Sequence, residues 1–253
     1  MEKNRIIITG ASGNIGTKLS VALKGKYDLT LLDRRISVIE DIIQVDLSHY
    51  RRNWINYFKG VHTVIHLAAN SHVEAIWSEL VPDNIDCVLN VCKASVVNGV
   101  KRMIFASSNH TMGGYRDEDI RMITADMEPR PDCDYGASKL IGERIMRFYS
   151  SLCSVSVICL RIGSVYPGSE MPDSGADDWC KSLWLSNSDM VQIFERSIEA
   201  EDIGFEILYA MSKYGIRQWD LERTMDVLDY QPERILMTSQ KVINAPRVGR
   251  PNQ

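Results

Sequence analysis

Several features that would place this chain in a special class of protein are missing from its sequence. No apolar run reaches the roughly 18 residues that a membrane-spanning helix needs. Acidic residues outnumber basic ones, 33 to 29, and the net charge of −4 argues against a general nucleic-acid-binding protein. The chain enters its first predicted strand, Arg5–Thr9, almost at once, so we expect no signal peptide.

Cysteine and histidine do not follow the patterns of a disulfide scaffold or a metal site. The six cysteines include no C-x-x-C pair, so a reducing cytoplasm is the expected location. His49, His62 and His72 have no carboxylate or cysteine partner at the spacing of a zinc site. We therefore expect no bound metal.

The most informative segment present is Ile6-Ile7-Ile8-Thr9-Gly10-Ala11-Ser12-Gly13-Asn14-Ile15-Gly16. A run of β-branched residues ends in three glycines spaced three apart, and a helical pattern follows directly. Backbone amides at a helix N-terminus can then approach a pyrophosphate closely. Because the glycines lie between a strand and a helix, they predict a dinucleotide site.

Asp33 ends the next apolar run and bears on which dinucleotide binds. A carboxylate at this position accepts hydrogen bonds from ribose hydroxyls and repels a 2′-phosphate, which favours NAD over NADP. The adjacent pair Arg34-Arg35 keeps NADP open, since a nearby arginine can attract that phosphate. Stacking on adenine is an alternative role for Arg34.

Short apolar runs alternate with helical patterns through the first two-thirds of the chain. The predicted strands are Arg5–Thr9, Asp28–Leu32, Ile42–Val45, Thr63–Leu67, Met103–Ser107 and Val155–Arg161. The predicted helices are Ile15–Leu23, Trp54–Phe58, Leu80–Val97, Ser138–Ser151 and Met190–Glu199. This order predicts an α/β fold, a Rossmann-like doubly wound parallel sheet with helices on both faces.

We expect residues 1–163 to form the dinucleotide-binding domain, which also carries the catalytic residues. Residues 164–253 are expected to form a small C-terminal substrate lobe and a tail within the same compact unit. Two irregular stretches, Thr111–Asp134 and Ser164–Asp178, follow strands and contain prolines. They are predicted to be substrate loops at the cofactor edge of the sheet.

Tyr135 and Lys139 are separated by four positions, so they share one face of a helix. An ammonium beside a phenol stabilises the phenolate and lowers the pKa of the tyrosine. A surface pair with no function is the alternative for this spacing. The glycine-rich turn, and Ser107-Ser108 at the end of a strand, favour a catalytic pair.

Together, the glycine triplet, Asp33, Ser108 and Tyr135-x-x-x-Lys139 resemble the extended short-chain dehydrogenase/reductase superfamily, in its NAD-dependent epimerase/dehydratase branch. The resemblance covers roughly residues 5 to 232. A narrower resemblance is to uronate dehydrogenases, and it rests on Phe105–Gly113, Tyr135–Lys139, Arg161–Ser164, Ser182–Ser186 and Trp219-Asp220. Those enzymes oxidise the anomeric carbon of glucuronate or galacturonate with NAD.

The resemblance implies a role for each matching position. Tyr135 would remove the proton from a sugar hydroxyl, Lys139 would hold the nicotinamide ribose, and Ser108 would hydrogen-bond the reacting oxygen. The expected substrate contacts are Ser71, Ser108, Asn109, His110, Tyr135 and Ser164. The expected cofactor contacts are Gly10, Ser12, Gly13, Asn14, Ile15, Gly16, Asp33, Arg34, Asp46, Leu47, Leu67, Ala68, Ala69, Asn84, Tyr135, Lys139 and Ile162.

One position departs from the uronate dehydrogenase pattern. Those enzymes carry an arginine for the substrate carboxylate shortly before the Ser-x-Trp-x-Ser segment, and here Trp179 stands in that place. Lys181 or Arg161 could substitute, although Asp177 and Asp178 disfavour an anionic group nearby. A hexuronate, a neutral aldose and another polyol therefore all stay open as substrates.

Two other functions remain open. A nucleotide-sugar epimerase or dehydratase would share the tyrosine and lysine, but only 89 residues follow Ser164 to form its diphosphate pocket. A non-catalytic NAD(H)-binding regulatory protein is the third candidate.

The predicted helices Leu80–Val97 and Ser138–Ser151 carry more apolar residues than one core-facing stripe requires. We expect a homodimer that pairs them, the alternative being burial within one subunit.

Overall fold

The computed structural model describes residues 3–35, 41–168, 176–213 and 219–232. Within these ranges one sheet has the order β3-β2-β1-β4-β5-β6-β7, and every neighbouring pair of strands is parallel. The strands are β1 (Arg5–Thr9), β2 (Asp28–Asp33), β3 (Ile42–Gln44), β4 (Thr63–His66), β5 (Arg102–Ser108), β6 (Ser156–Ile162) and β7 (Phe205–Ala210). The predicted C-terminal tail lies outside the described residues.

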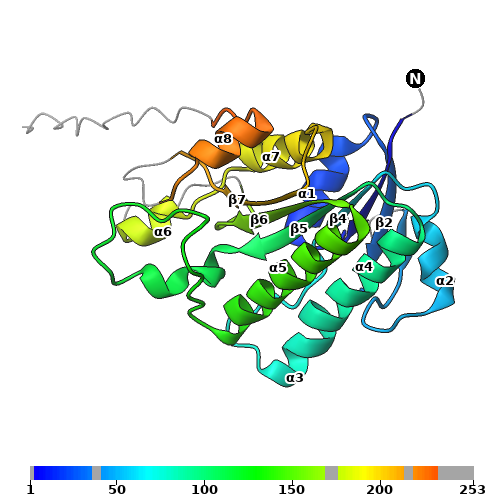
Figure 1. The fold of residues 1–253 in the computed structure, drawn as a ribbon, viewed down its shortest axis with the longest axis horizontal. Coiled ribbons are helices and arrows are strands. Elements are labelled where there is room, and N and C mark those ends of the chain that lie inside the picture. Colours follow the sequence, from blue (N-terminus) through cyan, green and yellow to red (C-terminus); the bar gives the residue numbers. More distant parts are fainter. Residues whose placement is uncertain (1–2, 36–40, 169–175, 214–218, 233–253) are drawn as a thin grey trace, which may run out of the picture.

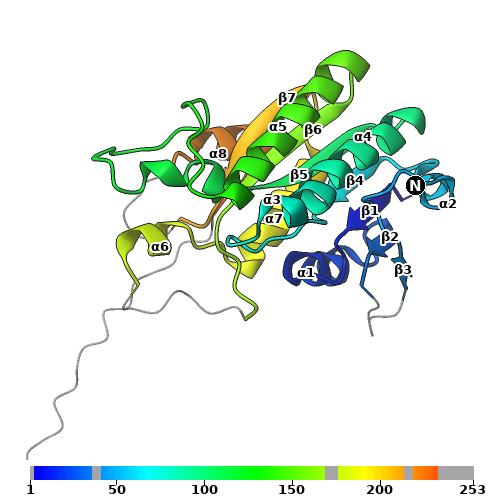
Figure 2. The same ribbon diagram turned by 90° about the horizontal axis from the view of Figure 1, so that it is seen from below.

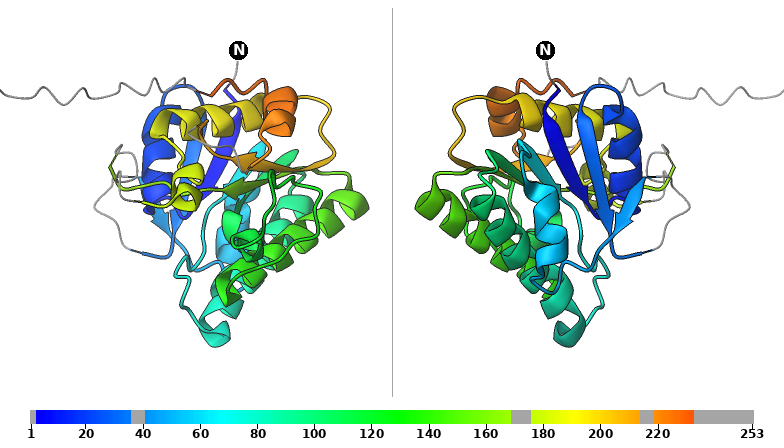
Figure 3. Two further views of the ribbon diagram at one scale, coloured as in Figure 1. Left: turned by 90° about the vertical axis from the view of Figure 1, so that its left-hand side faces the viewer. Right: turned by 90° about the vertical axis from the view of Figure 1, so that its right-hand side faces the viewer.

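Helices cover both faces of the sheet (Figures 1 and 3). One face packs against α1 (Asn14–Leu23), α7 (Asn187–Glu199) and α8 (Glu222–Leu228). The other face packs against α2 (Arg52–Ile55), the following turn η1 (Asn56–Phe58), α4 (Cys87–Val97) and α5 (Asp134–Cys153). Short helical segments complete the described fold: α3 (Trp77–Leu80), the π-helical turn η2 (Val81–Asp86), η3 (Asn109–Thr111), η4 (Gly113–Tyr115) and α6 (Asp178–Ser182).

The central strand shows why the sheet is covered on both sides. Ile6 and Ile8 belong to the core under α1 and α7, whereas Ile7 belongs to the core under α4 and α5. All three side chains are fully buried. A parallel strand with both faces buried is apolar at consecutive positions rather than at alternate ones. The predicted doubly wound parallel sheet is confirmed.

Three differences from the predicted elements are informative. The strand β7 and the helix α8 were not predicted, and β7 extends the sheet beyond β6. The single helix predicted over Leu80–Val97 is instead α3, η2 and α4 in succession. The helix predicted from Ser138 begins at Asp134, because the Cys133 sulfur caps it by accepting a hydrogen bond from Gly136 N at 3.4 Å.

A third apolar cluster lies beyond the carboxyl ends of β5, β6 and β7 and forms the small lobe. Its buried members are Met112, Tyr115, Ile123, Trp179, Leu183, Tyr209, Met211, Trp219 and Leu221. The Trp219 ring lies 5.1 Å from both the Trp179 and the Tyr209 rings, measured between ring centres. The lobe therefore uses residues from both sides of the predicted boundary at 163, and it is not confined to residues 164–253.

The described helices include none whose length and apolar character would let it cross a lipid bilayer.

Candidate active site

The turn between β1 and α1 packs tightly against the segment that follows β4. Gly10 has a φ of +69°, and a Cβ on it would lie 2.7 Å from the Ala68 backbone nitrogen. A Cβ on Gly16 would lie 2.3 Å from the Gly10 carbonyl oxygen. Both positions therefore require glycine. A Cβ on Gly13 would lie 3.2 Å from the Gly10 carbonyl oxygen, and Gly13 lines the cleft, so backbone amides there can approach an anionic group.

A cleft of about 540 Å³ follows this turn along the carboxyl edge of the strands. The predicted site residues that line it are Gly10, Gly13, Asn14, Ile15, Gly16, Asp33, Arg34, Asp46, Leu47, Leu67, Ala68, Ala69, Ser71, Ser108, Tyr135, Lys139 and Ile162. The sheet thus brings together residues that are up to 152 positions apart in the chain, from Gly10 to Ile162.

Asp33 is held firmly at the end of β2. One carboxylate oxygen accepts a hydrogen bond from Ser12 N at 3.0 Å, and the other accepts one from Arg35 N at 2.8 Å. Burial raises the pKa of Asp33, but these hydrogen bonds outweigh it, so the pKa lies below its ordinary value. Asp33 is therefore an anionic acceptor placed beside the glycine-rich turn. Ser12 contributes to the site through its backbone.

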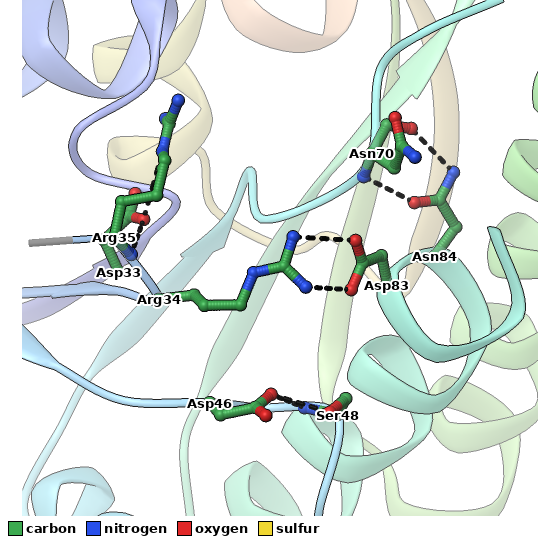
Figure 4. Close-up of polar contacts among 8 residues, drawn as sticks. All are labelled: Asp33, Arg34, Arg35, Asp46, Ser48, Asn70, Asp83 and Asn84. Atoms are coloured by element: carbon green, nitrogen blue, oxygen red, sulfur yellow. Dashed lines mark hydrogen bonds and ion pairs between the residues drawn. The ribbon is translucent and has the colours of Figure 1, made fainter. Parts of the chain in front are cut away.

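Arg34 reaches across the same end of the cleft to Asp83 in η2, as Figure 4 shows. Its Nη1 and Nη2 donate to the two Asp83 oxygens at 2.6 and 2.9 Å. The stacking of Arg34 on adenine stays a prediction, since this pairing lies in the plane of the guanidinium. Asp46 lies below Arg34 in Figure 4 and accepts hydrogen bonds from the backbone nitrogen and the hydroxyl of Ser48.

At the other end of the cleft, β5 ends at Ser108 and α5 begins beside it. Lys139 is 3% exposed, and its Nζ donates to the Ala106 carbonyl oxygen at 2.9 Å. This nitrogen lies 5.8 Å from the centre of the Tyr135 ring. Ser108 hydrogen-bonds the Tyr135 side chain, which lowers the pKa of the phenol. The predicted serine, tyrosine and lysine therefore form one group.

The pKa predicted for Tyr135 is corrected by this geometry. Burial raises the pKa of Tyr135 to about 12, and the Ser108 hydrogen bond opposes that rise without reversing it. Burial also lowers the pKa of Lys139 to about 8. The chain alone therefore does not produce the low phenol pKa that we expected, because burial has the largest effect on this pKa and raises it.

A model of the NAD dependent epimerase/dehydratase family matches residues 6–177. The chain belongs to this family.

Individual relatives agree with the family model. The chain is 32% identical to NAD-dependent glucose-6-phosphate dehydrogenase from Haloferax volcanii, over 90% of this chain and 92% of that protein. It is 33% identical to uronate dehydrogenase from Pseudomonas putida, over 96% of this chain and 88% of that protein. The structure of a uronate dehydrogenase variant from Agrobacterium tumefaciens complexed with NAD superposes with a TM-score of 0.79, at 26% identity over 91% of this chain and 85% of that one.

The cleft of this epimerase/dehydratase family member fits NAD. Gly13 lines the cleft without a side chain, which leaves the backbone of the turn accessible to a pyrophosphate. The ionised Asp33 lies where ribose hydroxyls can donate to it. Lys139 and Tyr135 line the far end, so the nicotinamide ribose and ring would lie between them and Ile162.

Besides Ser12, four predicted site residues of this family member do not line the cleft. Asn84 is 1% exposed and hydrogen-bonds Asn70 and Ser138, so the prediction of a direct cofactor contact is replaced by a role in joining the Asn70 loop to α5. Ser164 pairs its backbone with Leu183 and Leu185. Asn109 is buried in η3, and the fourth residue, His110, is described below.

His110 lies between α5 and the loop before it. The centre of its ring is 5.7 Å from that of Tyr135, and its Nδ1 is 2.9 Å from Asp132 Oδ1. The Cys133 sulfur is 3.7 Å from the same nitrogen. Asp132 thus orients His110 at the rim of the site, next to the Tyr135 ring.

Arg161 is not available to bind a substrate anion. Its guanidinium contacts both oxygens of Glu143, at 2.9 and 3.0 Å, and both side chains are 1% exposed. Glu143 also accepts a hydrogen bond from the Ser107 hydroxyl at 2.6 Å. The group is a buried support beneath β5, α5 and β6, and the suggestion that Arg161 replaces the missing arginine is wrong.

Several cleft residues were not predicted as site residues: Arg35, Val45, Asn70, His72, Asp83, Cys87, Ala106, Ser107 and Val165. Asn70 and His72 stand beside Ser71 in a predicted strand-end loop, so their positions could have been found. Asp83 and Cys87 belong to a helical run with no local motif. Contacts between residues far apart in the chain, such as the Arg34–Asp83 ion pair, bring them to the cleft.

Proposed function

We propose that this chain is an NAD-dependent sugar dehydrogenase that oxidises the C1 hydroxyl of an aldose or hexuronate, with Tyr135 as general base. The observation that carries the proposal is that Ser108, Tyr135 and Lys139 share one cleft with the glycine-rich turn and Asp33. The named relatives, which are dehydrogenases of glucose 6-phosphate and of uronates, support the same chemistry.

In the proposed reaction, bound NAD supplies the acceptor for the hydride. The Tyr135 oxygen takes the proton from the sugar hydroxyl, and the Ser108 hydroxyl hydrogen-bonds the same sugar oxygen and fixes its position. Because burial disfavours a phenolate, positive charge close to Tyr135 is required, and Lys139 supplies it from within the chain. The hydrogen bond to the Ala106 carbonyl fixes the position of that charge.

Charges at the substrate end favour a neutral aldose over a hexuronate. No lysine or arginine occurs from residue 162 to residue 180. Three cations in the neighbouring loops are paired: Arg116 contacts Asp177, Arg130 contacts Glu118, and Lys181 lies 4.0 Å from Asp178. Since a sugar carboxylate needs a cation to replace its hydration, the pairing of these side chains disfavours an anionic substrate.

A substrate panel tests the proposal directly. The purified protein is incubated with NAD and with neutral aldoses, hexuronates, sugar phosphates or UDP-sugars, and NADH is followed by its absorbance. We expect NADH formation with a free aldose and a kcat/KM at least about tenfold lower with hexuronates, which corresponds to roughly 1.4 kcal/mol. Conversion of a UDP-sugar without net NADH would instead indicate an epimerase.

Tyr135→Phe tests the role of the phenol in the same assay. The variant keeps the ring that packs beside His110 and loses only the oxygen, so we expect kcat to fall at least about a hundredfold. NAD binding, measured by calorimetry, should stay within about threefold because the phenol adds little to ground-state affinity. Unchanged turnover would contradict the proposed mechanism, and loss of NAD binding would indicate a structural role.

We also propose a cytoplasmic homodimer. The six cysteines are free, which suits a reducing compartment. The helices α4 and α5 lie side by side on one face of the molecule (Figure 2), and their outer surface carries an apolar groove. We call this groove the α4–α5 surface, and Leu89, Leu140, Ile141, Arg144, Ile145, Phe148 and Tyr149 line it. Phe148 is 57% exposed within one copy, so a partner subunit would bury it.

A further inference from the structure

Arg34 and Asp83 form a bridge over the adenosine end of the cleft. Arg34 follows Asp33 directly at the end of β2, whereas Asp83 lies 49 residues later in η2. The guanidinium uses two nitrogens and the carboxylate uses both oxygens, at 2.6 and 2.9 Å. This planar, two-bond arrangement fixes the direction of the arginine as well as its distance. Figure 4 shows the bridge crossing from one wall to the other.

The bridge determines which groups of the chain can meet a phosphate on the ribose. A 2′-phosphate would lie at the end of β2, beside Asp33, where an arginine is the usual neutralising group. Two arginines follow Asp33, but the donors of Arg34 point toward Asp83 instead. Asp83 and Asp46 both raise the pKa of Arg34, so the local field also favours the bridged position.

Arg35 occupies a different place. Its Nε lies 3.6 Å from Asp33 Oδ1, and one of its terminal nitrogens lies 3.7 Å from where a Cβ on Gly13 would be. Arg35 thus extends along the glycine-rich turn, on the pyrophosphate side of Asp33. Arg35 is present in the wild type and in every Asp83 variant, so a difference in NADP affinity among them does not come from removing it.

We propose that Asp83 is a cofactor-selectivity residue, which favours NAD over NADP by holding Arg34 away from the ribose 2′ position. Asp33 repels a 2′-phosphate directly, and Asp83 removes the arginine that would offset this repulsion. The inference rests on the proposed binding of a nicotinamide dinucleotide in this cleft, and it assigns a function to a residue outside the glycine-rich turn and the catalytic group.

Direct binding measurements test the proposal without any sugar. Dissociation constants for NAD and NADP are measured by calorimetry for the wild type, Asp83→Ala and Asp83→Asn. We expect both variants to bind NADP about tenfold more tightly than the wild type, because the released guanidinium can pair with the phosphate. The dissociation constant for NAD should change less than about threefold, since its free hydroxyls gain no ion pair.

Two control variants separate the bridge from a simple change in net charge. Asp86→Ala removes the same charge three residues later in η2 and leaves the Arg34 partner in place, so NADP affinity should stay near that of the wild type. In Arg34→Ala/Asp83→Ala the released arginine is absent, so the gain in NADP affinity should disappear.

Three outcomes would overturn the proposal. They are an unchanged NADP affinity in both Asp83 variants, an equal gain in Asp86→Ala, and a gain that persists in the double variant. Because these constants are measured without substrate, an absence of sugar oxidation would contradict the proposed function and leave the selectivity result interpretable.

Discussion

The native state disfavours the charged form of Lys139. Its ammonium is almost fully buried, and burial lowers its pKa to about 8. In the unfolded chain the ordinary lysine pKa is about 10.4. The folded protein therefore holds this proton less tightly than the unfolded chain does, and the charged side chain lowers the free energy of unfolding at neutral pH. The proposed catalysis needs the charge that the fold disfavours.

Lys139→Met is expected to be inactive and more stable than the wild type. At about pH 7 the variant should gain up to about 3 kcal/mol in the free energy of unfolding, because a buried charge is removed. Between about pH 8 and about pH 10.4, Lys139 loses its proton in the folded wild type but keeps it in the unfolded chain. The free energy of unfolding of the wild type therefore rises over this range, and the advantage of the variant should shrink. Urea unfolding at both ends of this range measures the difference. A variant less stable than the wild type at neutral pH would contradict this reasoning.

Residues with local motifs were placed correctly from the sequence, and residues held by distant partners were not. The glycine-rich turn, Asp33 and the Tyr135–Lys139 pair all line the predicted cleft, since each depends on a short strand–turn–helix pattern. Arg34 pairs with a residue 49 positions away, and Asn84 bonds Ser138, 54 positions away. No local spacing contains those partners, so the ion pair and the buried amide became visible only in the fold.

At the scale of elements, one buried group of side chains joins three of them beneath the proposed catalytic residues. Ser107 is in β5, Glu143 is in α5 and Arg161 is in β6, and all three are buried. Arg161 also donates to the Ala125 carbonyl oxygen at 3.2 Å, which ties the loop before α5 to the sheet. A charge pair this far from water is stable only while both partners remain.

Glu143→Gln should therefore destabilise the protein by about 3–5 kcal/mol, because it leaves a buried guanidinium without its counter-ion. Glu206→Gln is the matched control, since it breaks the exposed pair with Arg223 and should lower the free energy of unfolding by less than about 1 kcal/mol. Glu143→Leu/Arg161→Met should lose less than the single variant, as no unpaired charge remains. Chemical unfolding measures all three, and equal effects of the two glutamine substitutions would contradict the prediction.

Apolar runs predicted the first six strands to within about two residues at each end. Four of them, β1, β4, β5 and β6, are almost wholly buried, as parallel strands covered on both faces are. The strand β7 was not predicted, since its sequence Phe205-Glu206-Ile207-Leu208-Tyr209-Ala210 includes a half-buried stretch at the edge of the sheet. The helical period over Leu80–Val97 was recognised, but the wide turn at η2 was not. That turn directs Asp83 toward Arg34. The position of Asp83 therefore depends on packing rather than on helical periodicity.

The α4–α5 surface gives a prediction for the whole molecule. In the proposed dimer a charge at Phe148 would be buried without a partner, so Phe148→Glu should convert the dimer to a monomer at micromolar concentration. Val21→Glu, at a 73% exposed position on α1 on the other side of the sheet, should leave the dimer intact. Sedimentation velocity compares them. A monomeric wild type, or identical behaviour of the two variants, would rule out this interface.

The strand order also has a consequence for how the protein is made. The central strand β1 pairs with β2 and β4, and four of the seven described strands, β1 to β4, lie within residues 5–66. At the roughly 5–20 residues per second of protein synthesis, these strands leave the ribosome seconds before Tyr135 has been added to the chain. The glycine-rich turn and Asp33 are therefore complete while the catalytic helix does not yet exist.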